Sequence, residues 1–189
     1  MGKLVVTEFL SVDGVFEDPR WTFEFDRGTE GEHYKLDELM AADAQLLGRV
    51  TYEGFAQAWP SMTDDVGFAD KMNSMPKYVV SSTLAEASWN NSTIISPESS
   101  DPAKEVAALK ERYTGDILVA GSATLARWLL SERLVDELHL MVFPVVLGKG
   151  RTLFGGEPAF DSTRLALADV KRFGPDAVTV LEYTVTGAL

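Results

Sequence analysis

The spacing of apolar residues changes once along this chain, and that change predicts its architecture. Up to about residue 131, short apolar runs alternate with segments in which apolar residues recur every three or four positions. This alternation is typical of buried strands that are each followed by an amphipathic helix. From Glu137 onward the period is two, with Leu138 and Leu140 on one face of a predicted strand. We therefore expect an α/β fold whose last third is antiparallel.

Turn residues and helix signals set the expected boundaries of these elements. Strands are predicted over residues 3–10, 44–47, 77–82, 93–95, 117–120 and 137–143, with a closing hairpin over 165–173 and 177–185. Helices are predicted over residues 36–43, 51–58, 68–74 and 122–131, and between Asp101-Pro102 and Gly115. No linker rich in Pro, Gly or Ser interrupts the sequence, so we expect residues 1–189 to form one domain.

Two stretches end an apolar run in glycine and continue into a predicted helix. One spans residues 46–52, with Gly48 at the junction, and the other spans 117–125, with Gly121. A helix start presents unpaired N–H groups and the positive end of the helix dipole, so both junctions suit an anion. Side chains that can donate to a phosphate accompany them: Arg49, Thr51, Ser122 and Thr124. Two such junctions indicate a ligand with more than one phosphate, such as a dinucleotide.

Composition narrows the classes of function. The 17 Lys and Arg against 29 Asp and Glu give a net charge of −12, which argues against a nucleic-acid partner. With no Cys and two His, the chain offers no thiolate chemistry, and we predict no metal site. The first residues lack the pattern of a signal peptide and no stretch is long enough for a membrane span, so a cytoplasmic protein without a membrane partner is expected.

Five motifs follow one another with regular spacing. They are Ser11-Val12-Asp13-Gly14, Gly48-Arg49-Val50-Thr51-Tyr52-Glu53, Val80-Ser81-Ser82-Thr83, Ala120-Gly121-Ser122 and Phe143-Pro144-Val145-Val146-Leu147-Gly148-Lys149-Gly150. With these five motifs in this order, the chain resembles the dihydrofolate reductase-like superfamily. More narrowly, it resembles stand-alone relatives of the reductase (C-terminal) domain of the riboflavin-biosynthesis deaminase–reductase. The resemblance covers nearly the whole chain. It implies a three-layer α/β/α fold with a mixed, mostly parallel sheet and an antiparallel C-terminal hairpin.

The resemblance also implies NADPH as the cofactor. The first junction would meet the pyrophosphate and the adenosine 2′-phosphate, through Gly48, Arg49, Val50 and Thr51. The end of the strand at 77–82 would line the adenosine, through Ser81, Ser82 and Thr83. The second junction would cradle the pyrophosphate, through Gly121, Ser122, Ala123, Thr124 and Leu125. Read from chemistry alone, Arg49 could instead pair with a surface carboxylate, and Thr51 and Ser122 could be helix caps.

Two acids are candidates for catalysis. Asp13 either faces the nicotinamide pocket or bonds its own turn, as Asp in an Asp-Gly turn commonly does. Glu32, sixteen residues before Gly48, occupies the place of the acid that helps to protonate substrate in dihydrofolate reductases. The alternative for Glu32 is a solvated acid in the first turn of a helix, which the helix dipole favours.

These features predict an NADPH-dependent reductase that transfers a hydride to a small heterocyclic substrate, similar to a pterin or a pyrimidine. The resemblance points to 5-amino-6-(5-phosphoribosylamino)uracil as one such substrate. Riboflavin reductases, however, carry a basic residue directly after the Asp-Gly turn, where this chain has Val15. The alternative is a nucleotide-binding module that kept the fold without turnover. An NADPH-dependent reductase would need few catalytic side chains, because the cofactor carries the chemistry.

The strand at 138–143 bears on assembly, because both of its faces are apolar apart from His139. A strand at the antiparallel margin of a single domain should have one wetter side. We therefore expect one face to pack on the core and the other on a second subunit, in a two-fold homodimer like those of many relatives. The alternative is that the helix at 122–131 covers the second face. His139 itself is expected to be structural.

Overall fold

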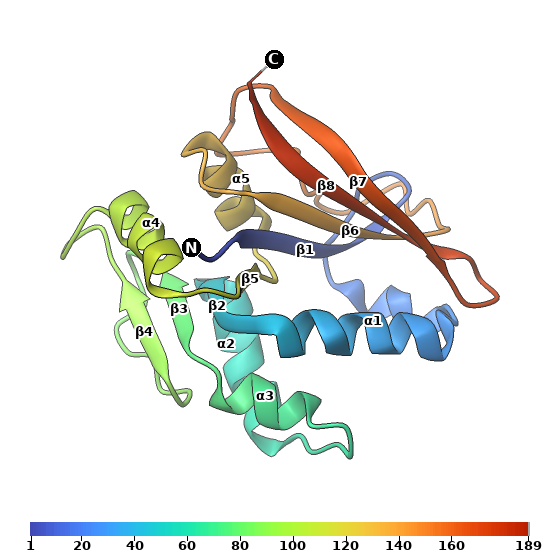
Figure 1. The fold of residues 1–189 in the computed structure, drawn as a ribbon, viewed down its shortest axis with the longest axis horizontal. Coiled ribbons are helices and arrows are strands. Elements are labelled where there is room, and N and C mark those ends of the chain that lie inside the picture. The colour runs from blue at the N-terminus through green and yellow to red at the C-terminus, as the bar shows by residue number, and fades with distance from the viewer. Residues whose placement is uncertain (189) are drawn as a thin grey trace.

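The computed structural model describes residues 1–188, which contain an eight-stranded sheet with helices on both faces (Figure 1). Its strand order is β4-β3-β2-β5-β1-β6-β8-β7. The strands are β1 (Leu4–Ser11), β2 (Ala42–Gly48), β3 (Lys77–Val80), β4 (Ser92–Ile95), β5 (Asp116–Val119), β6 (Glu137–Phe143), β7 (Thr163–Phe173) and β8 (Val178–Ala188). Pairs among β1 to β6 are parallel, and β8 is antiparallel to both β6 and β7. The predicted mixed sheet with an antiparallel end is confirmed.

The helices form the two outer layers. They are α1 (Gly28–Ala41), α2 (Arg49–Ala58), α3 (Phe68–Ser74), α4 (Pro102–Arg112) and α5 (Ala123–Ser131), with short 3-10 turns η1 (Pro19–Glu24) and η2 (Trp59–Ser61). In Figure 1, α1, α2 and α3 lie on one side of the sheet and α4 and α5 on the other. In the part of the chain that the structure describes, no helix is long and apolar enough to span a membrane.

Side chains of strand β1 pack against the helices on both faces of the sheet. Leu4 and Val6 are fully buried with residues of α4 and α5, whereas Val5, between them, is buried with residues of α1 and α2. Successive side chains of a strand point to opposite faces, so an unbroken apolar run is what a strand covered on both faces requires. Each such side chain contributes about 1.5–3 kcal/mol by leaving water.

Two element boundaries differ from the predicted ones for local reasons. The helix expected at 36–43 begins earlier, at Gly28, and ends at Ala41, which leaves Asp43 in β2. The Asp43 carboxylate accepts the N–H groups of Thr114 and Gly115 at 3.2 and 2.6 Å, which ties the start of β2 to the entry into β5. The strand expected at 77–82 ends at Val80, because Ser81 begins a turn.

The position of β6 overturns the argument made for a homodimer from its sequence. This strand lies inside the sheet, between β1 and β8, so neither of its edges is free. Leu138 and Leu140 are buried with α5 residues, and Met141 and Phe143 pack in a second cluster with Val178. The alternative interpretation, that the helix after Ser122 covers the second face, is confirmed. The expectation that one face of β6 meets a second subunit was wrong, because residues of this chain cover both faces. Strands β8 and β7 extend the sheet beyond β6, so β6 is not a marginal strand.

Candidate functional site

The two glycine junctions meet at one edge of the sheet. Strands β2 and β5 are parallel neighbours, so Gly48 and Gly121 follow them at the same end, where α2 and α5 begin. The Gly48 N–H donates to the Gly121 carbonyl oxygen over 3.4 Å. A Cβ atom on Gly48 would lie 2.5 Å from Ser122 Oγ, and one on Gly121 would lie 2.8 Å from Thr51 Oγ1. Only glycine fits at either position, and Gly121 also has a φ of +89°.

The two helix starts differ in how their N–H groups are satisfied. Ser122 caps α5, since its Oγ accepts from the Leu125 N–H at 3.4 Å. Helix α2 has Gly48 as its N-cap and no side-chain cap. The cap interpretation is therefore confirmed for Ser122, whereas Thr51 lies within α2. An uncapped helix start beside a glycine turn keeps donors available for an anionic ligand.

A cavity of about 600 Å³ opens beside these junctions. It combines the first turn of α2, the end of β3, the start of α4 and one face of α5. Its lining includes the predicted residues Gly48, Arg49, Val50, Ser81, Ser82, Ser122, Thr124 and Leu125. It also includes residues that sequence reasoning missed, among them Asp101, Trp128 and Glu132. Trp128 follows Thr124 by four positions, so the helical period from the second junction would have found it.

A second cavity, of about 540 Å³, adjoins the first across the helix starts. The two share Val50, Ser122 and Thr124 in their linings, and the second adds Thr51 and Ala123. Its opposite wall is the loop at residues 150–157. Together the two adjoining cavities form one cleft along the starts of α2 and α5.

Arg127 on α5 holds that loop in place. It is buried, and its guanidinium donates to the carbonyl oxygens of Leu153 at 2.9 Å and Glu157 at 2.6 Å. The sequence carried no signal for this role, because the partners are main-chain atoms of an irregular segment.

Two predicted cofactor residues, Gly121 and Thr83, line neither cavity. Thr83 is exposed and lies outside both linings, and its N–H donates to Ser81 Oγ at 3.1 Å. Arg49 lines the first cavity, but its guanidinium also pairs with Glu53 at 2.8 Å. The alternative that Arg49 pairs with a surface carboxylate is thus observed in the structure. A phosphate would have to replace Glu53 as the partner of Arg49.

Asp13 and Glu32 both lie outside the two linings. The Asp13 carboxylate accepts from Ser11 Oγ at 2.7 Å and from the N–H groups of Leu147 and Gly148 at 3.1 and 2.8 Å. These hydrogen bonds, that of Ser11 foremost, lower the pKa of Asp13 to about 2. These contacts join the turn at residues 11–14 to the segment at residues 147–148, so Asp13 bonds both its own turn and a distant loop.

Glu32 lies in the first turns of α1. Its carboxylate forms a two-point pair with Arg27, with both N···O distances at 2.8 Å, and its side chain is 63% exposed. Arg27 in turn lies over the ring of Phe9, 5.5 Å from its centroid. Glu32 is therefore linked through Arg27 to Phe9 of β1, and its carboxylate is already paired.

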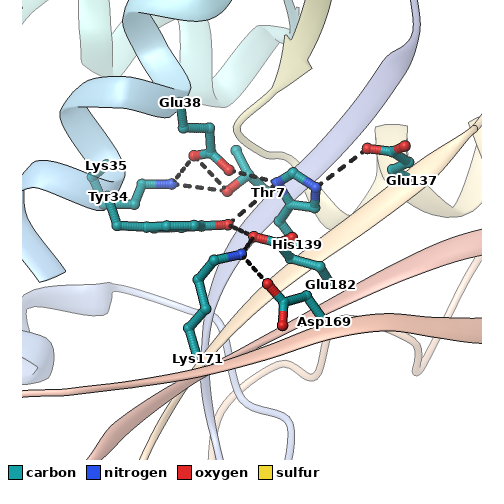
Figure 2. Close-up of polar contacts among 9 residues, drawn as sticks. All are labelled: Thr7, Tyr34, Lys35, Glu38, Glu137, His139, Asp169, Lys171 and Glu182. Carbon is teal, nitrogen blue, oxygen red and sulfur yellow. Dashed lines mark hydrogen bonds and ion pairs between the residues drawn. The ribbon is translucent and has the colours of Figure 1, made fainter.

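A second polar region lies under α1, where it faces β1, β6, β8 and β7 (Figure 2). Its members share direct hydrogen bonds or ion pairs: Thr7, Tyr34, Lys35, Glu38, Glu137, His139, Asp169, Lys171 and Glu182. We call this set the α1 cluster. At its centre the Glu38 carboxylate, 7% exposed, accepts from Thr7 Oγ1 at 3.0 Å and pairs with Lys35 and with His139 Nδ1, the latter at 2.9 Å.

The charges of the α1 cluster compensate one another. Burial would raise the pKa of Glu38, but the charge of Lys35 and the hydrogen bond from His139 outweigh it and hold this pKa at about 2. Burial likewise would lower the pKa of His139, and Glu38 raises it above its ordinary value instead. These groups are satisfied by one another, which is what a structural charge network requires. The expectation that His139 is structural agrees with these contacts.

Comparison with known proteins extends over the whole chain. The family model of the RibD C-terminal domain matches residues 2–179. YwjB of Bacillus subtilis (strain 168) is 30% identical over 177 residues, which cover 91% of this chain and 92% of YwjB.

Solved structures share the fold at lower identity. A protein from Shewanella sp. PV-4 with a suggested role in riboflavin biosynthesis has a TM-score of 0.76 at 19% identity, over 97% of this chain and 99% of that chain. Dihydrofolate reductase from Enterococcus faecalis, complexed with NADP(H), has a TM-score of 0.58 at 15% identity, over 99% and 96% of the two chains. The predicted dihydrofolate reductase-like fold is confirmed.

Proposed function

The chain belongs to the RibD C-terminal domain family, and from that premise we propose that it is an NADPH-dependent reductase. In this proposal it transfers a hydride to a small heterocyclic substrate of the pterin or pyrimidine class. The observation that carries the proposal is the cleft over two glycine junctions. A Cβ atom on Gly48 would collide with Ser122 and one on Gly121 with Thr51, so these glycines keep the two helix starts close together beneath the cleft. The N–H groups of the helix starts are the donors that an anionic ligand would use.

The residues present fit a phosphorylated dinucleotide. The pyrophosphate would lie over the starts of α2 and α5, where Ser122 and Thr124 line both cavities. The adenosine would occupy the first cavity, beside Ser81 and Ser82. Arg49 is the cation of that lining and would take the 2′-phosphate in exchange for Glu53.

The nicotinamide end would then extend toward the second cavity, under the loop at 150–157. When bound, NADPH supplies the hydride, and the protein orients both ring systems and limits access of water. Of the two predicted acids, Glu32 remains our candidate for proton delivery, because its side chain is largely exposed and can leave Arg27. Asp13 is held by three hydrogen bonds and fixes the turn instead.

The riboflavin step itself is a narrower proposal. At the position where riboflavin reductases carry a basic residue, Val15 is buried, and a Cβ atom on Gly150 would lie 2.8 Å from its side chain. Val15 itself offers no positive charge to a substrate phosphate at that position. We therefore rank unphosphorylated pterins and pyrimidines with 5-amino-6-(5-phosphoribosylamino)uracil as substrates to be tried.

Binding measurements test the cofactor before any substrate is known. Titration of the purified chain with NADPH and with NADH, followed by nucleotide fluorescence, should give tighter binding of NADPH. Equal affinities would contradict the assignment of Arg49, and no binding of either would contradict the cleft as a dinucleotide site. Binding of NADPH without oxidation by any pterin or pyrimidine would favour the alternative of a nucleotide-binding module.

Three further expectations stay proposals: one domain over residues 1–189, a cytoplasmic location and a homodimer. With β6 covered on both faces, a second copy could instead pack on the edge strand β7, where Leu167 and Val170 are 55% and 51% exposed. Light scattering at micromolar concentration decides the last point. A mass near the single-chain 20.7 kDa would contradict the dimer, and twice that mass would support it.

A further inference from the structure

Arg127 is a buried cation without an acidic partner, and it lines the second cavity of the cleft. It is 6% exposed, and its guanidinium donates to two main-chain carbonyl oxygens, those of Leu153 and Glu157. The chain contains 29 Asp and Glu, yet within residues 1–188 the arginines with an ion pair are Arg20, Arg27, Arg49 and Arg151. Buried charges in proteins are ordinarily paired, so the partner of Arg127 is to be sought in a ligand.

The Arg127 guanidinium has donors to spare for such a ligand. A guanidinium carries five N–H groups, and those of Arg127 make three hydrogen bonds within residues 1–188. Nη1 donates to the Leu153 carbonyl oxygen at 2.9 Å, and Nε and Nη2 both donate to that of Glu157, at 3.2 and 2.6 Å. Burial, and then the charge of Arg151, lower the pKa of Arg127, but a guanidinium stays protonated at neutral pH.

The place of Arg127 on α5 directs this charge toward the start of the helix. Helical side chains lean toward the N-terminus, and residues three and four positions apart share a face. Arg127 follows Thr124 by three positions and Ala123 by four, and all three line the second cavity. Ser122 satisfies the N–H of Leu125, whereas those of Ala123 and Thr124 have no acceptor within residues 1–188. A buried cation and unpaired N–H groups therefore lie along one wall.

The other charged residues of this lining already have partners. Arg151 pairs with Glu17 at 2.6 Å, and its side chain is 70% exposed. Glu157 offers Arg127 its carbonyl oxygen, while its carboxylate accepts from the Ala159 N–H at 3.0 Å. In a chain with a net charge of −12, an unneutralised buried cation makes this wall locally attractive to anions.

We propose that Arg127 is a binding residue for the pyrophosphate of the cofactor, in addition to its contacts with the loop at 150–157. The proposal rests on the proposed function, since the pyrophosphate is that of NADPH. Its oxygens would accept from the remaining N–H groups of Arg127 and from the N–H groups of Ala123 and Thr124. Hydrogen bonds between a guanidinium and a phosphate are charge-assisted, so the ligand supplies the anion that the buried cation lacks.

Two substitutions separate the charge of Arg127 from its contacts with the loop. Arg127→Lys keeps the charge, and Arg127→Gln removes it, but both side chains can still donate to the two carbonyl oxygens. Arg127→Gln should bind NADPH roughly 10- to 100-fold more weakly, as expected when a hydrogen bond to a charged group is lost. Arg127→Lys should stay within about fivefold of the unchanged protein, because an ammonium also binds phosphate. Arg164→Gln, which removes an exposed charge of β7, is the matched control and should bind normally.

A nucleotide without a pyrophosphate localises the effect. Adenosine 2′-monophosphate carries only the groups that the proposed function places in the first cavity, beside Arg49. Calorimetric titrations of each variant should show that Arg127→Gln keeps its affinity for this nucleotide while it loses affinity for NADPH. In the unchanged protein, the Nε–H signal of Arg127, identified by its absence from Arg127→Lys, should shift in NMR spectra with NADPH and stay in place with adenosine 2′-monophosphate.

The outcomes distinguish this proposal from the one on which it rests. If the unchanged protein binds neither nucleotide, the proposed function fails, and the role of Arg127 with it. If NADPH binds but Arg127→Gln binds it as tightly as the unchanged protein, the role of Arg127 alone is overturned. Equal losses in Arg127→Lys and Arg127→Gln, or an Nε–H signal that NADPH leaves in place, would likewise limit Arg127 to holding the loop. Circular dichroism and a urea titration establish that each variant is folded before its affinity is compared.

Discussion

The cleft over the glycine junctions and the α1 cluster are both polar regions, and they differ in what their polar groups contact. In the α1 cluster, each charge meets an opposite charge or a hydrogen-bond donor from the same chain (Figure 2). In the cleft, main-chain N–H groups and hydroxyls face a cavity, and the one guanidinium of the first lining is held by a single exposed pair. Polar groups that pair with one another stabilise the fold, whereas polar groups that face an open cavity are available to bind a ligand.

A dense cluster of charged side chains is therefore not by itself evidence of a functional site. The α1 cluster holds a buried His–Glu–Lys arrangement that would attract attention as catalytic machinery. Its carboxylate is fully engaged and lies away from both cavities. The candidate site has fewer charges and depends on two residues without side chains. If this comparison is right, substitutions in the α1 cluster act on stability, and substitutions in the cleft act on binding.

The largest effect is expected from Glu38→Gln. The change removes the central charge of the α1 cluster and leaves Lys35 buried without its partner. We expect the free energy of unfolding to fall by about 3–5 kcal/mol, as for other buried ion pairs that lose one member. A urea titration measures this loss, and NADPH affinity at 10 °C, where the variant is folded, should be unchanged.

Glu53→Gln is the matched control, because it removes the acid of the exposed Arg49 pair. Its effect on unfolding should stay below about 1 kcal/mol. It should also bind NADPH at least as tightly as before, since Arg49 is released. Comparable losses of stability in the two variants would remove the distinction between the regions.

The second-largest effect is expected from Gly121→Val, and it concerns NADPH binding. The new Cβ would lie 2.8 Å from Thr51 Oγ1, so the junction must open and the N–H donors must shift. We expect NADPH to bind at least 100-fold more weakly, which corresponds to about 2.7 kcal/mol. Gly54→Val, on the exposed face of α2 where a Cβ meets nothing within 4 Å, should keep full affinity. Normal binding by Gly121→Val would place the pyrophosphate elsewhere.

How far the sequence could predict these regions depends on whether a contact is local. The periods of two and of three to four predicted the sheet and its helices, because burial on one or both faces dictates them directly. The two junctions were predicted for the same reason, since a strand, a glycine and a helix start follow one another in sequence. Parallel neighbours then bring Gly48 and Gly121 together.

What the sequence could not predict depends on pairing across long separations. Glu8 reads as one polar residue in an apolar strand, and only the pairing of β1 with β6 places it beside Leu140. The path of the loop at 150–157 depends on the guanidinium of Arg127, whose acceptors are carbonyl oxygens that carry no residue signature. The covered state of β6 depends on where β8 joins the sheet.

Arg49→Ala should have an intermediate effect, confined to the choice of cofactor. If Arg49 contacts the 2′-phosphate, its loss weakens NADPH binding by about 1–3 kcal/mol, as expected for a hydrogen bond to a charged group. NADH, which lacks that phosphate, should bind as before. Parallel fluorescence titrations with both nucleotides measure the ratio. A variant that still prefers NADPH to the same extent would assign the 2′-phosphate to another residue.

The smallest effect should be a pH dependence that belongs to the α1 cluster. Burial lowers the pKa of His139, but Glu38 raises it to a net value above 6.5 in the folded protein. His139 therefore stabilises the fold most below pH 6.5, and this contribution is lost as pH rises through its raised pKa. We expect the difference in unfolding free energy between the unchanged protein and His139→Gln to shrink by about 1 kcal/mol between pH 6 and 9. Glu8 also destabilises the fold as pH rises toward 8, but it is present in both proteins and cancels in the difference. A difference that stays constant or grows with pH would mean that His139 is neutral in the fold, and the α1 cluster would then have one charge fewer than the comparison assumes.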